Sequence, residues 1–185
     1  MATDSTRTAI LDAARQVLFD EGWEALSHQR VAEVAGVGRA TVYRHWPQRL
    51  QLLQDACGAE MLTIHTQPTG DLRADLAAEL LSMRQETVER RAGRVLIALT
   101  DRAVWEPEIA QVKQRMLKDG FSNLRLILRR GMDEGQLSPD LDLDGTISRI
   151  VGSWVYRYLI LDQEISEDMV LVVLDDFLAA NLLVP

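Results

Sequence analysis

Hydrophobic residues recur at helical spacing near the start of the chain. The first stripe has the i, i+3, i+4, i+7, i+8 pattern of an amphipathic helix and consists of Ile10, Ala13, Ala14, Val17 and Leu18. We expect Ser5 or Thr6 to cap the start of this helix and Gly22 to close it, because glycine adopts the left-handed conformation found at helix ends. Trp23 and Leu26 follow, and we expect these apolar side chains to pack into the core.

A second, shorter pattern predicts two helices joined by a tight turn. Val31, Val34 and Ala35 share one helical face, and Ser27 stands where a residue that caps the helix start is needed. Gly36 then supplies the backbone freedom for a turn, and Val37 fills the angle between the helices.

The next helix, residues 38–46, is polar on most of its surface. Its clearly apolar positions are Val42 and Trp46, four residues apart, and Pro47 ends it. One side therefore anchors the helix, while Arg, Ala, Thr, Tyr and His side chains are free to face a partner. Such residues suit the major groove and phosphates of DNA, although an ordinary helical hairpin with a solvated outer face is the alternative.

Residues 7–53 resemble the DNA-binding domain of the TetR/AcrR family of transcriptional regulators. The resemblance covers TRTAILDAARQVLFDEGW and LSHQRVAEVAGVGRATVYRHWPQRLQLL, in order and without gaps. It implies base contacts from Gln29, Arg39, Ala40 and Thr41. It implies phosphate contacts from Ser27, Tyr43, His45 and Arg49, and we add Arg44 to the DNA-facing set.

Four positions depart from the family pattern. Arg30 replaces a usual acidic residue and places a cation at the positive end of its own helix, which costs roughly a few tenths of a kcal/mol. Gly38 stands where serine is frequent, and Gln48 where serine or asparagine leads the next helix. Arg49 replaces the typical lysine. These changes affect helix starts and base selection more than phosphate binding.

The charge of the chain is uneven. The net charge is −8, yet residues 1–50 hold six arginines and six acidic residues, so the excess of acid lies beyond them. Between Ser27 and Arg49, four arginines face Glu33 alone. A dimer would present two basic patches on an acidic body, and its DNA binding should depend strongly on salt.

The remainder of the chain predicts helices, without strand alternation. We expect a fourth helix to Ile64 or His65, a stripe of Leu72, Leu76, Leu80, Met83 and Thr87, and a helix ending near Trp105. One long helix is expected to run from Ile109 through Leu128 and to stop around Gly131 to Pro139. The predicted fold is all-α: an N-terminal three-helix helix-turn-helix DNA-binding domain (1–50) followed by a helical ligand-binding and dimerisation domain (51–185).

The last two helices are apolar over most of their circumference, which indicates burial on more than one side. We expect them to form a four-helix homodimer interface around a two-fold axis, with closure of a single-chain core as the alternative. The predicted interface residues are Ile147, Val151, Trp154, Val155, Tyr158, Val170, Val173, Leu174 and Phe177.

Several side chains in the helical body are candidates for an adaptable ligand pocket, because Met fills irregular space and a few polar groups lie beside the apolar stripes. The candidates are Met61, Met83, Thr87, Arg102, Trp105, Met116, Phe121, Asn123 and Trp154. For each of these residues, the alternative is ordinary packing in the core or a position at a solvated helix edge. His65 is expected at a helix end.

The sequence also argues against other classes of protein. It has no glycine-rich phosphate loop after a strand, no metal-ligand spacing and no isolated acid pair, so we expect neither an enzyme nor a cofactor. Cys57 is expected to be a small core residue. With no membrane span or signal peptide, the expectation is a cytoplasmic homodimeric repressor, released from a palindromic double-stranded DNA operator by a small-molecule effector. The alternative is a dimeric small-molecule-binding or protein-interaction module without specific DNA binding.

Overall fold

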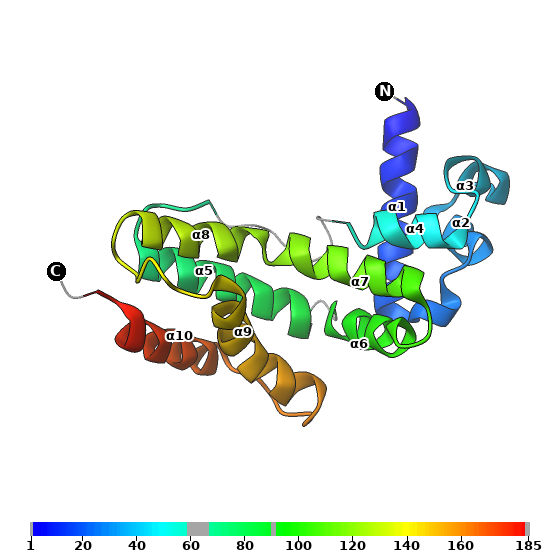
Figure 1. Ribbon diagram of the computed structural model, residues 1–185. Helices are drawn as coiled ribbons and strands as arrows, with labels where there is room; N and C mark the ends of the chain where they lie inside the picture. Colours follow the sequence, from blue (N-terminus) through cyan, green and yellow to red (C-terminus); the bar gives the residue numbers. More distant parts are fainter. Residues whose placement is uncertain (1, 59–66, 90–91, 184–185) are drawn as a thin grey trace. The chain divides into compact units, whose positions relative to one another are not determined.

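The structure is a computed structural model that describes residues 2–58, 67–89 and 92–183, with side chains from residue 5 onward. Within these ranges the chain is helical apart from turns, loops and one isolated antiparallel bridge between Leu137 and Leu182 (Figure 1). The helices form two compact units. The first unit comprises residues 1–62 and 90–119, and the second comprises residues 63–89 and 120–185. The predicted all-α class is confirmed.

The first unit contains the amino-terminal helices together with two later ones. Its elements are α1 (Ala2–Asp20), the 3-10 turn η1 (Trp23–Ala25), α2 (His28–Ala35), α3 (Arg39–His45), α4 (Arg49–Ala56), α6 (Ala92–Ala103) and α7 (Pro107–Gly120). The predicted functional boundary at residue 50 is a different division of the chain from these compact units, and it stays a prediction.

Helix α1 begins earlier than the sequence pattern predicted. It starts at Ala2, so Ser5 and Thr6 lie inside the helix and do not cap it. Residues 2–6 contain no proline or glycine that would prevent helix formation. At the other end, the N–H of Gly22 donates to the carbonyl of Val17 at 3.1 Å, and Gly22 has the predicted positive φ, 84°.

The core of the first unit is built on the predicted stripe of α1. Ile10, Ala14 and Val17 are fully buried, and α6 and α7 add Val95, Leu99, Ile109, Val112 and Met116 to the same cluster. From α3, Val42 and Trp46 enter this cluster as predicted. Helices α2 and α3 therefore share one core with α6 and α7.

Helix α4 is shorter than predicted. It ends at Ala56, and Cys57 leaves helical geometry with φ −86° and ψ 12°. The expected continuation to Ile64 or His65 lies outside the described residues, as does the pocket candidate Met61.

Cys57 is buried in the first core, as the sequence predicted, with 3% of its surface exposed. Burial raises the pKa of its thiol to about 12. Because the thiolate is the reactive form, iodoacetamide at pH 8 should alkylate the native protein on the order of a thousandfold more slowly than the urea-unfolded chain. A mass-spectrometric time course would measure both rates, and equal rates would contradict the burial of this thiol.

The raised pKa also sets a pH dependence. Between pH 9.0 and about 12 the unfolded chain loses the thiol proton while the folded chain keeps it. Stability is therefore fully present below pH 9 and declines as the pH rises towards the pKa of the folded state. Cys57→Ala should remove this part of the alkaline decline.

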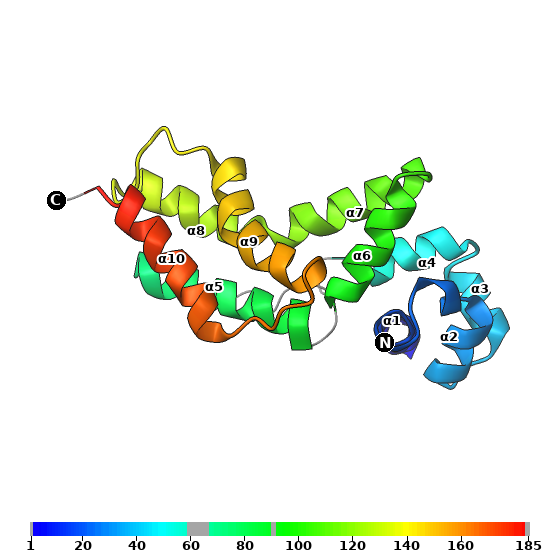
Figure 2. The same cartoon turned by 90° about the horizontal axis from the view of Figure 1, so that it is seen from below.

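The second unit has two layers of helices. Its elements are α5 (Leu72–Arg84), the π-helical turn η3 (Gln85–Glu89), α8 (Ser122–Asp133), α9 (Leu143–Leu159) and α10 (Glu167–Asn181). Figures 1 and 2 show α9 and α10 together on one side of the α5 and α8 pair. Asp142 and Ser166 cap the starts of α9 and α10 through bonds from the backbone N–H groups of Gly145 and Met169.

The predicted long helix over residues 109–128 is wrong. Two helices occupy this range, because Phe121 leaves helical geometry with φ −94° and ψ 3° between α7 and α8. Gly120 directly precedes this break, and glycine lowers the stability of a helix interior. The break coincides with the boundary between the two units.

The predicted stripe of α5 is confirmed over its first four members, since Leu72, Leu76, Leu80 and Met83 are buried. Thr87 is only partly buried, and Glu86 is buried next to it. The π-helical turn η3 explains this change, because its wider winding alters which residues face the core.

Across the described ranges 2–58, 67–89 and 92–183, no helix combines the length and apolar composition needed to cross a membrane. The same ranges contain no cluster of three or more His, Cys, Asp or Glu residues that could hold a metal ion.

Candidate nucleic-acid interface

The turn between α2 and α3 has the geometry that its glycines favour. Gly36 is left-handed (φ 66°, ψ 29°), and the N–H of Val37 donates to the carbonyl of Ala32 at 3.0 Å. Gly38 starts α3 in an extended conformation without a side-chain cap. Ser27 caps α2, because its Oγ accepts the N–H of Arg30 at 3.1 Å. The predicted helix-turn-helix is confirmed.

One side of α3 is anchored and the other is open. Val42 and Trp46 are 0% and 2% exposed and hold the helix against the first core. The open side carries exposed Arg39, Ala40, Tyr43 and Arg44, with Thr41 and His45 partly exposed. The sequence therefore predicted both faces of this helix.

The open side is organised by a chain of contacts that starts at Arg39. The Nη2 group of Arg39 donates to the hydroxyl of Tyr43 at 3.1 Å, and its guanidinium lies 5.1 Å from the centre of the Tyr43 ring. The Tyr43 ring stacks on His28 with a centroid distance of 4.0 Å and an angle of 7°. Tyr43 is thus held by a ring beneath it before any DNA is bound.

His28 is a positioning residue that the sequence reasoning missed. It is 7% exposed, and its Nε2 lies 2.6 Å from the carbonyl oxygen of Trp46. Since a carbonyl can only accept, Nε2 must carry the proton and donate it. His28 therefore joins the start of α2 to the end of α3. The sequence signal that could have identified this role is its position directly after the Ser27 cap.

A second set of contacts fixes the end of α3 to α1 and α4. Oδ2 of Asp55 accepts both the indole N–H of Trp46 at 2.9 Å and Nη2 of Arg7 at 2.5 Å. The guanidinium of Arg7 also lies 5.2 Å from the centre of the Trp46 ring. We call Arg7, Trp46 and Asp55 the Asp55 clamp. Its residues were not among the predicted site residues, because they come from three separate helices.

Arg49 is less free than its predicted phosphate role suggested. Its guanidinium stacks on Trp23, 3.9 Å from the ring centre, and Nη2 donates to the carbonyl of Trp23. Burial lowers the pKa of this guanidinium, and Glu106 raises it by a smaller amount. Its Nε is buried without a partner in the described part of the chain. Nη1 of Arg49 forms no hydrogen bond with the described residues. The assignment of Arg49 to a phosphate stays a prediction.

The two predicted contacts at the start of α2 lie on the surface. Ser27 and Gln29 are both exposed. Gln29 donates from Nε2 to Oε1 of Glu33 at 2.7 Å, which together with Arg30 holds the pKa of that carboxyl below its ordinary value. Ser27 keeps its hydroxyl proton available, because its capping bond uses the oxygen only as an acceptor.

Ion pairs offset the unfavourable position of the Arg30 cation at the positive end of its own helix. Its Nε and Nη2 donate to the carboxylate of Glu21 at 2.7 to 3.0 Å, and Nη1 reaches Glu33 at 3.4 Å. The hydrogen bond from Arg30 lowers the pKa of Glu21. This departure from the family pattern therefore links α2 to the end of α1.

The predicted pocket residues are divided between the two units. Met83, Thr87, Phe121, Asn123 and Trp154 belong to the second unit, where Met83, Phe121 and Trp154 share one hydrophobic cluster. Asn123 is buried and donates to Glu79 at 2.6 Å. The structure therefore brings part of the predicted set together in the second unit.

The other three described candidates belong to the first unit. Met116 is buried in its core, and Arg102 pairs with Glu24 and with Glu106. Trp105 is 81% exposed in the turn after α6, and its pocket-lining role stays a prediction.

The predicted dimer residues pack within one chain, and their role in a dimer interface stays a prediction. Six of them are enclosed in the core of one chain: Ile147, Val151, Trp154, Val170, Leu174 and Phe177. Val155, Tyr158 and Val173 are partly buried against the same core. The alternative of a single-chain core thus describes these side chains. The exposed apolar residues of the two helices are different ones, and they include Tyr156 at 54% and Val172 at 58%.

Comparison with known proteins agrees with this architecture. Residues 10–56 match the family described as bacterial regulatory proteins, tetR family, and residues 66–177 match the tetracyclin repressor-like C-terminal domain. A crystal structure of the TetR family transcription regulator SCO0332 superposes with a TM-score of 0.77 at 27% identity, covering 97% of this chain and 99% of that one.

Two curated relatives extend the comparison. The uncharacterized HTH-type transcriptional regulator YdeS of Bacillus subtilis is 25% identical over 169 residues, which cover 90% of this chain and 85% of the relative. The tetracycline repressor protein class C of Escherichia coli is 36% identical over 122 residues, or 63% of this chain and 55% of the relative. These relatives are DNA-binding regulators, as the prediction of a non-enzyme requires. The chain belongs to the TetR family of transcriptional regulators.

Proposed function

We propose that this regulator is a homodimeric repressor that binds a palindromic operator and is released from it by a small molecule. The observation that carries the proposal is the open side of α3, where Arg39, Ala40, Tyr43 and Arg44 are exposed while Val42 and Trp46 anchor the helix. A helix with short and basic exposed residues fits the major groove of DNA.

The side chains divide into base readers and phosphate holders. Arg39 uses one N–H on Tyr43, which leaves further donors for the O6 and N7 atoms of a guanine. Ala40 and the methyl of Thr41 suit the thymine methyl, and Gln29 suits a base edge. The Tyr43 hydroxyl accepts from Arg39, so its own proton can go to a phosphate.

The remaining phosphate holders surround this centre. We assign Ser27 and Arg49 to phosphates on either side of α3, and Arg44 and His45 to the phosphates next to its end. Arg44 has no ion pair among the residues described, so its charge is available to a phosphate. Each neutralised phosphate steepens the dependence of binding on salt.

The homodimer supplies the second reading helix. We assign the interface to the outer faces of α9 and α10, where Tyr156 and Val172 are exposed apolar groups on helices whose inner faces are already buried. Gly152, one turn before Tyr156 on α9, has open space where a Cβ would stand, so a partner helix can approach closely. Two reading helices then meet half-sites about 34 to 36 Å apart along the duplex.

Ligand response fits the same arrangement. A small molecule that binds one dimer geometry better than the other changes DNA affinity by the ratio of its two affinities, a coupling of about 1 to 3 kcal/mol in typical regulators. The repressor role is supported by the similarity to the tetracycline repressor protein class C. We propose that the effector binds in the second unit, where Met83, Phe121 and Trp154 belong to one hydrophobic cluster.

The test is a titration of the purified protein on duplex DNA from upstream of its own gene, against a random duplex, over a series of salt concentrations. Arg39→Ala should reduce discrimination at particular base pairs by roughly 1 to 3 kcal/mol, while Tyr43→Phe should weaken all duplexes alike. Arg129→Ala, an exposed arginine on α8, is the matched control and should change neither. Affinity equal to that of random duplex at every salt would favour a binding module without specific DNA recognition.

A further inference from the structure

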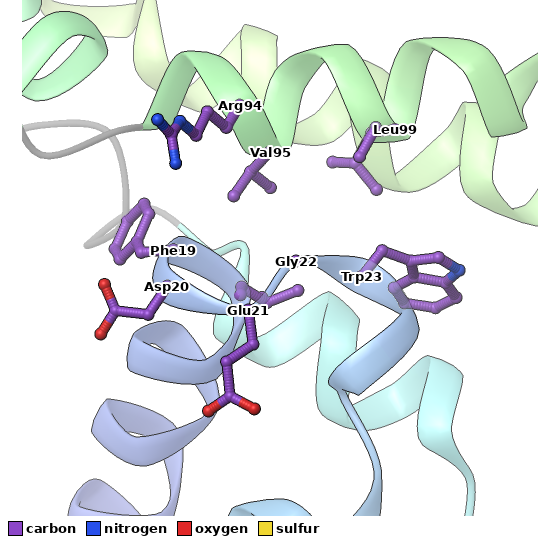
Figure 3. Close-up of a pocket in the computed structure, with 10 residues that line it drawn as sticks. Phe19, Asp20, Glu21, Gly22, Trp23, Arg94, Val95 and Leu99 are labelled. Atoms are coloured by element: carbon purple, nitrogen blue, oxygen red, sulfur yellow. The ribbon is translucent and has the colours of Figure 1, made fainter.

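A hollow lies inside the first unit, away from the open side of α3. It has a volume of about 210 Å³ and is formed by the end of α1, η1 and the first two turns of α6 (Figure 3). Its lining residues come from two short stretches: Leu18 to Trp23, and Arg94, Val95, Ala98 and Leu99. None of these residues is among the proposed DNA contacts or pocket candidates of the second unit.

The floor of the hollow is apolar. Leu18, Val95 and Leu99 are 2%, 3% and 1% exposed, and Figure 3 shows Val95 and Leu99 pointing from α6 toward the turn at Gly22. Phe19 and Trp23 are partly buried and stand on either side of that turn. Phe19 and Trp23 keep part of their apolar surface accessible, and a flat hydrophobic body would remove that surface from water.

Arg94 places a positive charge on the rim of the hollow. Arg94 is exposed, and none of the described residues forms an ion pair or hydrogen bond with it. Figure 3 shows its guanidinium reaching over the end of the hollow where Phe19 rises from α1. Arg94 is thus placed to meet a charged group on a ligand whose body lies on the floor.

Two acidic residues also line the hollow, and both carboxylates point away from α6 in Figure 3. Glu21 is already neutralised by its two-pronged pair with Arg30. Asp20 also interacts with another group of the chain. Of the three charged lining residues, Arg94 is the one that has no partner among the residues that the structure describes.

We propose that this hollow is a binding site for a small amphipathic carboxylate, with its hydrophobic part against Phe19 and Trp23 and its carboxylate on Arg94. The volume is below the range of about 300 to 1,000 Å³ typical of drug-sized ligands, so the ligand has the size of one aromatic ring with a short side chain. Such a ligand bridges α1 and α6. Of the proposed DNA contacts, Arg49 borders the site, because its guanidinium stacks on Trp23.

The experiment uses three probes with one shape and three charges: 3-phenylpropanoate, 3-phenylpropanamide and 3-phenylpropylammonium. Each is titrated into the full chain by calorimetry and by two-dimensional NMR, with the indole N–H of Trp23, assigned through Trp23→Phe, as the local reporter. The carboxylate should bind and shift the Trp23 signal, and it should bind on the order of tenfold more tightly than the amide. The ammonium should bind least.

Two variants and a control test the assignment of residues. Arg94→Gln should weaken the carboxylate on the order of tenfold and leave the amide unchanged, and Ala98→Leu should weaken both by filling the hollow. Arg115→Gln, an exposed arginine on α7, should change nothing. Thermal unfolding of each variant verifies its fold.

Equal binding of the three probes, carboxylate affinity unchanged in Arg94→Gln, or absence of a Trp23 shift at millimolar carboxylate would overturn the proposal. DNA titrations are not part of these readouts, so a failure here leaves the repressor proposal intact, and the reverse also holds.

Discussion

Replacing Trp154 with alanine is expected to lower the free energy of unfolding by about 3 to 5 kcal/mol. Trp154 is fully buried and is among the largest enclosed side chains of the chain. Its removal leaves a cavity that the surrounding helices of the second unit cannot fill completely. The measurement is urea unfolding at several protein concentrations, which separates folding from any association of chains.

A second variant at the same position sharpens this result. The indole N–H of Trp154 is buried and has no hydrogen-bond partner among the residues that the structure describes. Trp154→Phe keeps most of the packing and removes this unpaired donor, so it should cost much less than Trp154→Ala. If Trp154→Ala instead produced stable monomers, the side chain would belong to the partner interface, as the sequence pattern suggested.

The double substitution Tyr156→Asp and Val172→Asp is expected to give folded monomers with DNA affinity reduced on the order of a hundredfold or more. Both side chains are exposed in the single chain, so the charges do not disturb its core. In a two-fold interface each carboxylate would lose water and lie near its symmetry copy, which costs several kcal/mol. Sedimentation equilibrium, circular dichroism and fluorescence anisotropy with labelled operator report the three properties.

Leu126→Asp provides the matched control. Leu126 is 59% exposed on α8, in the same unit but in the other helical layer. We expect this variant to remain dimeric and to bind DNA as the wild type does. A dimer that survives the double substitution but is split by Leu126→Asp would move the interface from α9 and α10 to the opposite layer.

The helix-turn-helix could be predicted well because its signals are local. Ser27 at a helix start, Gly36 in a left-handed turn and Pro47 after a helix act through a few neighbouring residues, and the structure has each of them in that role. Val42 and Trp46 then decide which side of α3 is buried. A short stretch of sequence contains all the information needed for this part of the fold.

Other features depend on contacts between distant residues, and the sequence pattern left them undecided. Apolar periodicity shows that a helix such as α9 is buried, but it does not show whether the chain itself or a second copy covers it. The same limit applies to Arg49, whose residue type suits a phosphate while its stacking on Trp23 arises from a residue 26 positions earlier. Apolar residues also keep their helical spacing across Phe121. The sequence pattern therefore did not indicate the break between α7 and α8.

The Asp55 clamp has a consequence for how any signal can reach DNA. One carboxylate oxygen ties the first turns of the chain, through Arg7, to the end of the reading helix, through Trp46. Helices α1, α3 and α4 should consequently travel as one rigid body. Binding of an effector would then move these three helices together and leave their DNA-contacting surface unchanged. The protein with its effector bound would therefore keep its preference for particular bases within a single half-site.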